Sequence, residues 1–356
     1  MTSIDPPWAI AAFEPARAFG PALGSGVLRA QSDDFIVEED LGFAPAGMGQ
    51  HVLLKVRKRD ANTQWVAREL AKVCGCRPMD VGYAGLKDRR AVAVQWFTVP
   101  KSAVPSLDGW MAVRTSEFEV LEAHAHTRKL PRGALAGNSF IIRVRDAAGT
   151  DDQLAERVGL IGQRGVPNYF GPQRFGREGS NLLRISAGLR ALRPPERGFV
   201  LSAARSLIFN CLLVERVRDG SWERLEAGDI ANLDARGSVF AVDAADATLL
   251  ERCQRLDIHP TGPMWGRGLP ASQGRVLELE NGVAAQLAPA AEMVQEAGME
   301  QERRSLRLAV RDLQWSREAN AVVLRFRLAR GSFATTVLRE IFDVGGAAED
   351  DAGGEA

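Results

Sequence analysis

One segment of the chain combines a carboxylate with several cations, and it is the strongest candidate for chemistry. Residues 82–91 read GYAGLKDRRA, with two glycines ahead of Asp88. Glycines let the backbone approach a ligand closely, and Lys87 and Arg89 on either side favour a negative charge on Asp88. The pattern indicates an anionic group set among residues that bind phosphate. The alternative is a surface turn with a local ion pair, which contributes little.

A second segment is rich in aromatic and amide side chains. Residues 168–176 read NYFGPQRFG, broken by glycines and a proline. Such a loop is typical of a surface that stacks and hydrogen-bonds a nucleotide. A tight hinge anchored by its aromatic residues explains the same pattern equally well, so both interpretations stay open.

Three isolated phenylalanines stand where strands or helices begin. Phe35 lies in DDFIVEE at 33–39, Phe140 follows Asn138 in GNSF at 137–140, and Phe333 lies in GSFATT at 331–336. By pattern alone, a phenylalanine in such a place is more often core than binding site.

Several common mechanisms lose support because their motifs are missing. The sequence has no G-x-x-x-x-G-K-[ST] phosphate loop, no G-x-G-x-x-G after a strand, no G-x-S-x-G elbow and no cluster with metal-ligand spacing. A carboxylate enzyme that needs neither cofactor nor metal, or a binding protein, remains.

The charge of the chain is zero overall but unevenly distributed. Residues 50–100 hold ten Lys/Arg against four Asp/Glu, residues 120–200 hold thirteen against seven, and residues 303–342 hold nine against three, so each block carries +6. If the fold brings these blocks together, they form a positive surface suited to a polyanion. Solvated faces of an arginine-rich protein are the alternative.

Both strands and helices are needed to position these segments. Alternating patterns predict strands at 34–38, 51–57, 94–99, 139–145 and 322–328. Helices are expected from Asn62 or Thr63, from Thr150 with a capping box to Gln153, from Ser202, from Ser332, and from Pro289 to Met299.

Composition divides the chain into three parts. It turns acidic and Gly/Pro-punctuated near residue 163 and basic again near 305. We therefore expect a discontinuous domain from 1–162 and 306–344, an inserted domain at 163–305, and a disordered acidic tail at 345–356. Neither a signal peptide nor a membrane span is expected, and four cysteines without C-x-x-C spacing favour the cytoplasm.

Taken together, these segments resemble the TruD family of tRNA pseudouridine synthases. The resemblance runs in order through DFIVEE at 34–39, GLKDR at 85–89, GNSF at 137–140, NYFGPQRFG at 168–176 and GSFAT at 331–335. It implies an α+β fold, in which a mixed-sheet pseudouridine synthase catalytic domain carries an inserted, family-specific α/β domain. It also implies a positively charged cleft between the two domains.

The resemblance implies isomerisation of a tRNA uridine, at position 13 by the family name, to pseudouridine, without a cofactor. Asp88 matches the catalytic aspartate of the family. It would attack the sugar or the base, or remove a ribose proton; the sequence does not choose between these roles. Lys87 would pair with or position the carboxylate and Asn138 would orient its loop. The phenylalanines at 35, 140 and 333 would stack on the flipped base or shape its pocket.

Other classes of protein are less consistent with these residues. A non-catalytic RNA-binding protein on the same scaffold is expected to lack an acid at position 88. A methyltransferase needs a glycine-rich cofactor loop, and a purely structural dimer does not explain the loop at 168–176. Nothing marks an obligate interface, so a monomer is expected.

Overall fold

The computed structural model describes residues 7–101 and 106–346, which form two compact units. Among the described residues, the sheet unit consists of 23–101, 106–158, 311–331 and 342–346. The helical unit consists of 7–22, 159–310 and 332–341. Each unit is therefore assembled from several separate stretches of the chain.

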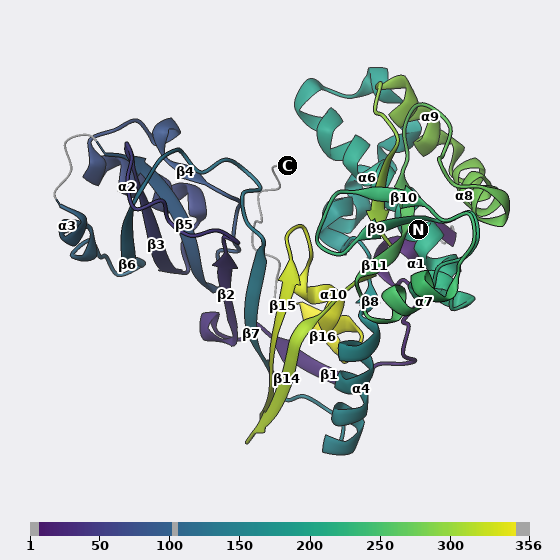
Figure 1. Cartoon of the computed structure of the whole chain (residues 1–356), viewed down its shortest axis with the longest axis horizontal. Helices are drawn as coiled ribbons and strands as arrows, with labels where there is room; N and C mark the ends of the chain where they lie inside the picture. The colour runs from purple at the N-terminus through teal and green to yellow at the C-terminus, as the bar shows by residue number, and fades with distance from the viewer. Residues whose placement is uncertain (1–6, 102–105, 347–356) are drawn as a thin grey trace. The chain divides into compact units, whose positions relative to one another are not determined.

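The sheet unit is built on a mixed β-sheet, seven strands of which form its main path (Figure 1). Their order is β14-β15-β7-β2-β5-β3-β6, and only β2 and β5 in this path run parallel. The bounds are Arg311–Glu318 (β14), Ala321–Ala329 (β15), Gly137–Arg145 (β7), Phe35–Asp40 (β2), Val92–Pro100 (β5), His51–Arg59 (β3) and Phe118–His126 (β6). Three short strands join at its margins: Ser25–Leu28 (β1), Gly82–Tyr83 (β4) and Asp343–Gly346 (β16).

The five predicted strands are all present, at β2, β3, β5, β7 and β15, with ends that differ by no more than two residues. Helices accompany the sheets in both units, so the predicted mixed α+β class is confirmed. Gly345 and Gly346, expected in the disordered tail, belong to β16, where they pair with β1. The rest of that tail lies outside the described residues.

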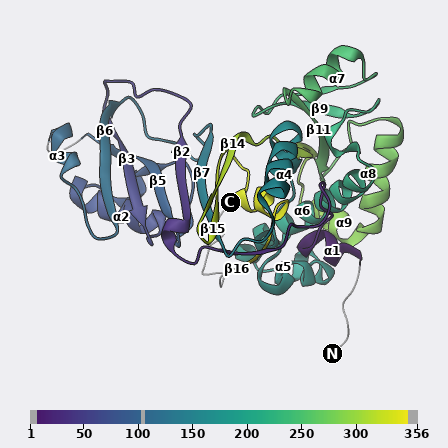
Figure 2. The ribbon, with the colours of Figure 1, turned by 90° about the horizontal axis from the view of Figure 1, so that it is seen from below.

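Helix α2, Thr63–Cys74, covers one face of β3, β5 and β6 (Figure 2). Val66 and Leu70 are four residues apart, so they share the helix face that turns toward the sheet. They pack there with Leu54 and Phe97, and all four side chains are buried. The helix ends at Gly75, whose φ of 68° allows the left-handed cap. The short helix α3, Leu107–Met111, lies beside β6.

The opposite face of these strands carries charged side chains, as the alternating pattern predicts. Lys55 lies between Glu38 and Glu122, with nitrogen-to-oxygen distances of 2.8 and 3.2 Å. Arg57 pairs with Glu119 at 2.9 Å.

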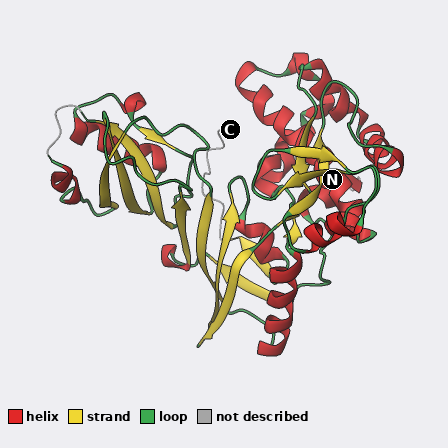
Figure 3. Ribbon diagram, in the orientation of Figure 1, coloured by secondary structure: helices red, strands yellow, loops and turns green. Residues whose placement is uncertain are grey.

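The helical unit is organised around α6, Pro194–Arg218 (Figure 3). Buried residues on all sides of this helix, including Ala204, Leu207 and Leu213, form the centre of the main core. Among the described residues, α6 is the one helix long and apolar enough to cross a membrane, which the sequence analysis did not predict. The most apolar 18-residue stretch of α6 is 67% buried inside the protein. The central position of the helix in its unit therefore explains why it is so apolar.

Shorter elements surround α6. The helices are Pro7–Phe13 (α1), Ser180–Leu183 (α5), Ala247–Gln254 (α7), Gly274–Gln286 (α8), Ala288–Glu296 (α9) and Ala334–Arg339 (α10). The strands are Val166–Pro167 (β8), Ile230–Leu233 (β9), Val239–Ala241 (β10), Ile258–Met264 (β11), Glu302–Ser305 (β12) and Arg307–Leu308 (β13). Four of them form a sheet of order β10-β9-β11-β12, and β8 pairs with β13.

The predicted helices form, with different ends in three cases. Helix α4, Asp151–Arg164, begins with the expected capping box, in which Thr150 and Gln153 bond each other's backbone N–H at 2.9 and 3.3 Å. Helix α6 starts at Pro194, eight residues before the predicted Ser202, because a proline fits the first helical turn. Helix α10 starts at Ala334 rather than at Ser332, and α9 ends at Glu296 rather than at Met299.

The division into units differs from the expected domains in two separate segments and at both boundaries of the expected insertion. Residues 7–22 and 332–341, expected in the catalytic domain, belong to the helical unit, and so do residues 159–162 and 306–310. Arg339 donates to the carbonyl of Pro15, and Glu340 accepts a 2.9 Å bond from the N–H of Ala18. These polar contacts tie both segments together inside the helical unit. The catalytic and inserted roles of the two parts stay a prediction.

Candidate active site

The Asp88 segment lies beside β5, at the edge along which both β2 and β4 pair with that strand. Strand β3 pairs with β5 along its whole length on one edge. On the other edge, β2 pairs with residues 92–94 and β4 with residues 97–98. Residues 84–91 connect β4 back to the start of β5, so they pass the gap between β2 and β4.

Asp88 is held through its side chain by Arg29. The guanidinium of Arg29 donates from Nη2 to Oδ2 of Asp88 and lies over the ring of Phe35, 4.2 Å from its centroid. The side chain of Asp88 is 39% exposed, so a ligand can reach it. The site thus combines an accessible carboxylate, a cation that pairs with it, and an aromatic ring beneath the cation.

Lys58 holds the backbone of the same residue. Its fully buried ammonium donates to the carbonyl oxygens of Asp88 at 2.8 Å and of Ala61 at 2.7 Å. Burial lowers the pKa of Lys58 to about 8, against the opposing effect of the negative charge on Asp88. Arg29 and Lys58 therefore fix Asp88 from the side chain and from the backbone.

The Asp88 segment is also fixed by a chain of hydrogen bonds from the start of α2. The hydroxyl of Thr63 accepts from the N–H of Lys87 at 3.0 Å and donates to Oε1 of Gln95 at 2.9 Å. The amide of Gln95 in turn donates to the carbonyl of Gly85 at 2.6 Å. Because Thr63 and Gln95 are buried, these bonds replace contacts with water and keep the loop in one conformation.

Lys87 pairs with Glu39 rather than with Asp88. Its ammonium lies 2.5 Å from Oε1 of Glu39, and Oε2 accepts a 2.9 Å bond from the N–H of Trp96. Glu39 is completely buried and Lys87 is 10% exposed. A buried carboxylate needs a cation more than a half-exposed one does, so Lys87 supports the loop and does not contact the carboxylate of Asp88.

Phe35, which lies under the guanidinium of Arg29, packs against Phe140. Both are buried, and their rings meet edge to face with centroids 6.0 Å apart. Phe140 also stacks on Phe326 at 5.3 Å. That the two residues shape a pocket for the base stays a prediction. Direct stacking of a base on either ring stays a prediction.

Asn138 lies on the same face of the sheet but makes no hydrogen bond to the Asp88 loop. It is paired in register with Glu39 of β2 and with Leu328 of β15. Its side-chain oxygen Oδ1 is buried and has no hydrogen-bond partner among the described residues. A buried acceptor without a partner is rare in folded proteins.

Phe333 belongs to the helical unit, whereas the other five predicted site residues belong to the sheet unit. It is the N-cap residue of α10 and packs, half-buried, against the core around α6. Its expected place in the base pocket stays a prediction.

The structure decides between the two interpretations of residues 168–176. Tyr169, Phe170 and Phe175 are all buried in the core of the helical unit. Asn210 of α6 also binds both the N–H and the carbonyl of Phe170, each at 2.9 Å. The three rings are therefore packing residues and do not offer a stacking surface.

Sequence reasoning missed Arg29 and Lys58. Arg29 carries no local signal, because its contact with Asp88 joins residues 59 positions apart. Lys58 did carry a signal: it continues the buried alternation of Val52, Leu54 and Val56 in β3, where an apolar residue is expected. Among the described residues, the structure contains no group of three or more His, Cys, Asp or Glu able to hold a metal ion.

The fold agrees with that of a solved protein. A structure from Methanosarcina mazei, provisionally described as tRNA pseudouridine synthase D (TruD), matches with a TM-score of 0.74 at 22% identity. The match covers 96% of this chain and 99% of that one. The chain thus falls in the class of mixed α+β proteins that share this two-part architecture.

Sequence comparison then identifies the family. The profile for tRNA pseudouridine synthase D (TruD) matches residues 22–187 and 179–341. The tRNA pseudouridine synthase D of Nitrosococcus oceani is 43% identical over 327 residues, which cover 90% of this chain and 91% of that protein. That of Methylococcus capsulatus is 45% identical over 332 residues, covering 92% and 94%. The chain belongs to the TruD family, which confirms the resemblance seen in the sequence.

Proposed function

We propose that this protein is an isomerase, a tRNA pseudouridine synthase that uses Asp88 as its essential carboxylate. Membership of the TruD family supports the reaction. The observation that supports the residue is the accessible carboxylate of Asp88, fixed by Arg29 and Lys58 next to the buried rings of Phe35 and Phe140. By the family resemblance, the substrate uridine is at position 13.

The reaction is an isomerisation, so its atoms balance without a co-reactant. The bond between ribose and the base nitrogen breaks, the base turns, and a carbon of the same base bonds the ribose. That carbon loses its proton, and the freed nitrogen takes up a proton. The reacting nucleotide must leave its stack, which costs a few kcal/mol. A fixed carboxylate lowers the barrier because it does not reorganise during the reaction. Asp88 acts by attack on the sugar or base, or by removing a ribose proton.

We also propose that the protein acts in the cytoplasm as a monomer. Its substrate class supports the location, and its four cysteines, all free, are those expected in a reducing compartment. Size-exclusion chromatography with light scattering tests the monomer. A mass near twice the 38.6 kDa of the chain contradicts it.

The first test is tritium release from tRNA transcript labelled at carbon 5 of uridine, without added cofactor or metal. Wild-type protein is expected to release tritium and to form pseudouridine at one position. Asp88→Asn is expected to abolish release while tRNA affinity stays within about tenfold, or ~1.4 kcal/mol. The matched control is Asp33→Asn, an exposed carboxylate of the same unit that pairs with Arg59, and it is expected to keep wild-type turnover.

Two results would count against the proposal. If wild-type protein binds several tRNAs without releasing tritium, the chain is a non-catalytic RNA-binding protein. If Asp88→Asn retains turnover, another group does the chemistry. Loss of folding in this variant, seen by circular dichroism, would show a structural role for Asp88.

A further inference from the structure

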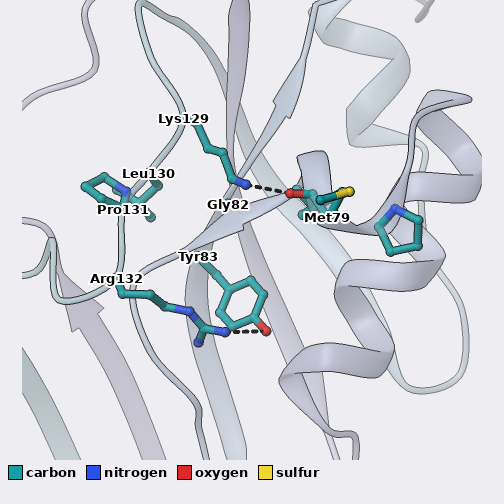
Figure 4. A pocket seen from close by; sticks show the side chains of 9 residues that line it. Met79, Gly82, Tyr83, Lys129, Leu130, Pro131 and Arg132 are labelled. Atoms are coloured by element: carbon teal, nitrogen blue, oxygen red, sulfur yellow. Dashed lines mark hydrogen bonds between the residues drawn. The ribbon is translucent and has the colours of Figure 1, made fainter. Parts of the chain in front are cut away.

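A pocket of about 520 Å³ opens on the sheet unit just before the Asp88 segment (Figure 4). The turn after α2 contributes Pro78 and Met79 to its wall, and β4 contributes Tyr83. Lys129 and Arg132, from the segment after β6, complete it. The volume lies within the range of about 300–1,000 Å³ that is usual for small-ligand pockets.

Both cations of the pocket lack an acidic partner. Lys129 donates to the backbone carbonyl of Met79 at 2.6 Å, and Arg132 donates to the hydroxyl of Tyr83 at 2.9 Å. Within the described part of the chain, neither forms an ion pair with a carboxylate. The nearby Asp80 is bound by Arg77 through contacts of 3.0 and 3.1 Å. The hydrogen bond from Arg77 and the charge of Lys129 both lower the pKa of Asp80, so Lys129 lies near this carboxylate without bonding it. The pocket therefore has two cations that carry no hydrogen bond to a carboxylate of the described residues.

The pocket also contains a preformed stacking element. The guanidinium of Arg132 lies over the ring of Tyr83, 4.0 Å from its centroid, and the hydrogen bond to the hydroxyl fixes it there. Arg132 is exposed on its other side. Bases of single-stranded RNA stack on aromatic rings and on arginine guanidinium planes. With Lys129 as a second cation beside this pair, the pocket suits a phosphate together with a base.

The pocket lies close to Asp88 along the chain. Tyr83 precedes Asp88 by five residues, a stretch that spans at most about 18 Å when fully extended. The carbonyl of Ala84 also accepts a 2.7 Å bond from the N–H of Gly133, which joins the start of the Asp88 segment to the segment bearing Arg132. A strand of RNA with one nucleotide at Asp88 can thus place another nucleotide, within a few positions of it, in the pocket.

We propose that this pocket is a second nucleotide subsite, which binds a nucleotide flanking the reacting uridine. Lys129 and Arg132 bind its phosphate, and its base stacks on the Arg132–Tyr83 pair. This inference rests on the proposed function, because it takes the RNA substrate of that function as its ligand.

The experiment measures tritium release and the binding of a fluorescein-labelled tRNA transcript at two salt concentrations. Lys129→Ala and Arg132→Ala are each expected to raise KM and Kd about fivefold to tenfold while kcat stays within twofold. The slope of log Kd against log salt should fall by about 0.7–0.9 for each phosphate that the variant no longer binds. Tyr83→Phe keeps the ring and should lose less affinity than Tyr83→Ala.

The control is Lys72→Ala, which removes one positive charge from an exposed part of α2 outside the pocket. If the pocket variants match Lys72→Ala in Kd and salt slope, the subsite is refuted. A fall in kcat at unchanged Kd would also refute it. Absence of tritium release from wild-type protein would overturn the proposed function instead, while the binding comparison would still decide whether the pocket holds RNA.

Discussion

At the scale of single residues, Asp88 depends on two cations that come from distant parts of the chain. Arg29 follows β1 and binds the carboxylate, while Lys58 ends a buried row of β3 and binds the backbone carbonyl. A buried ammonium is costly unless its protons are bonded, and here two carbonyl oxygens receive them. The free-energy cost of burying Lys58 is thus coupled to the position of Asp88.

The lowered pKa of Lys58 predicts a pH-dependent stability. In the unfolded chain Lys58 binds its proton up to a pKa near 10.5, and in the folded protein only up to about 8. Between these values the unfolded state holds more protons, so folding becomes more favourable as pH rises. Below pH 8 the full cost of the buried charge is present, and it declines between pH 8 and 10.5.

Lys58→Met removes this dependence. The free energy of unfolding of wild-type protein minus that of the variant is expected to rise between pH 8 and 10.5, by an amount on the order of 3 kcal/mol. Urea denaturation of both proteins at about pH 7, 8, 9 and 10 measures it. A difference that stays constant over this range would show that Lys58 is not deprotonated more easily in the folded state.

At the scale of elements, the site depends on a gap between two strands. Strands β2 and β4 pair with different parts of the same edge of β5 and leave residues 95 and 96 between them. The N–H of Trp96 lies in this gap, and the carboxylate of Glu39 accepts its hydrogen bond. Glu39 also binds Lys87, so a single side chain of β2 connects the sheet to the Asp88 segment. The gap gives the segment room, and Glu39 gives it a fixed attachment.

Glu39→Gln should therefore destabilise the sheet unit strongly. It leaves the ammonium of Lys87, which is 10% exposed, without a carboxylate, and breaking a buried pair costs about 3–5 kcal/mol. The matched control is Glu38→Gln on the opposite face, which is 49% exposed, pairs with Lys55, and should cost less than about 1 kcal/mol. Urea denaturation followed by circular dichroism compares them. Equal losses for the two variants would contradict the argument.

At the scale of the whole molecule, the helical unit joins stretches that are remote in sequence. Asn210 of α6 is the clearest link, because its amide donates to the carbonyls of Ala11 at 3.0 Å and Phe170 at 2.9 Å. Its oxygen accepts from the N–H of Phe170. One buried side chain thus binds the N-terminal segment and the 168–176 loop to the central helix.

Asn210→Ala is expected to lower the free energy of unfolding of the helical unit by at least about 2 kcal/mol. It leaves three buried backbone groups without partners, and each such group costs about 1–3 kcal/mol. Ser206, one turn earlier on α6, is equally buried, but its hydroxyl has no hydrogen-bond partner among the described residues, so Ser206→Ala should be nearly neutral. Guanidinium denaturation of both variants tests this. A similar loss in each would point to helix packing, not to the hydrogen bonds.

The sequence by itself determined the elements and pointed to the segment around Asp88 as the candidate site. Alternation at period two marked the strands, because a half-buried strand must place apolar side chains on one face. The Thr150–Gln153 box marked the start of α4 through a purely local exchange of bonds. The LKDR motif singled out Asp88 because its neighbours in the chain already make an unusual combination of charges.

Only the tertiary structure decided what surrounds Asp88. Charge alternation along 87–89 suggested that Lys87 serves the carboxylate, but the buried Glu39 of another strand takes it. Arg29 and Lys58 reach Asp88 from 59 and 30 residues away, and no local pattern reports such contacts. Desolvation is the physical reason: which cation pairs with which carboxylate depends on burial, and burial is set only when the strands assemble.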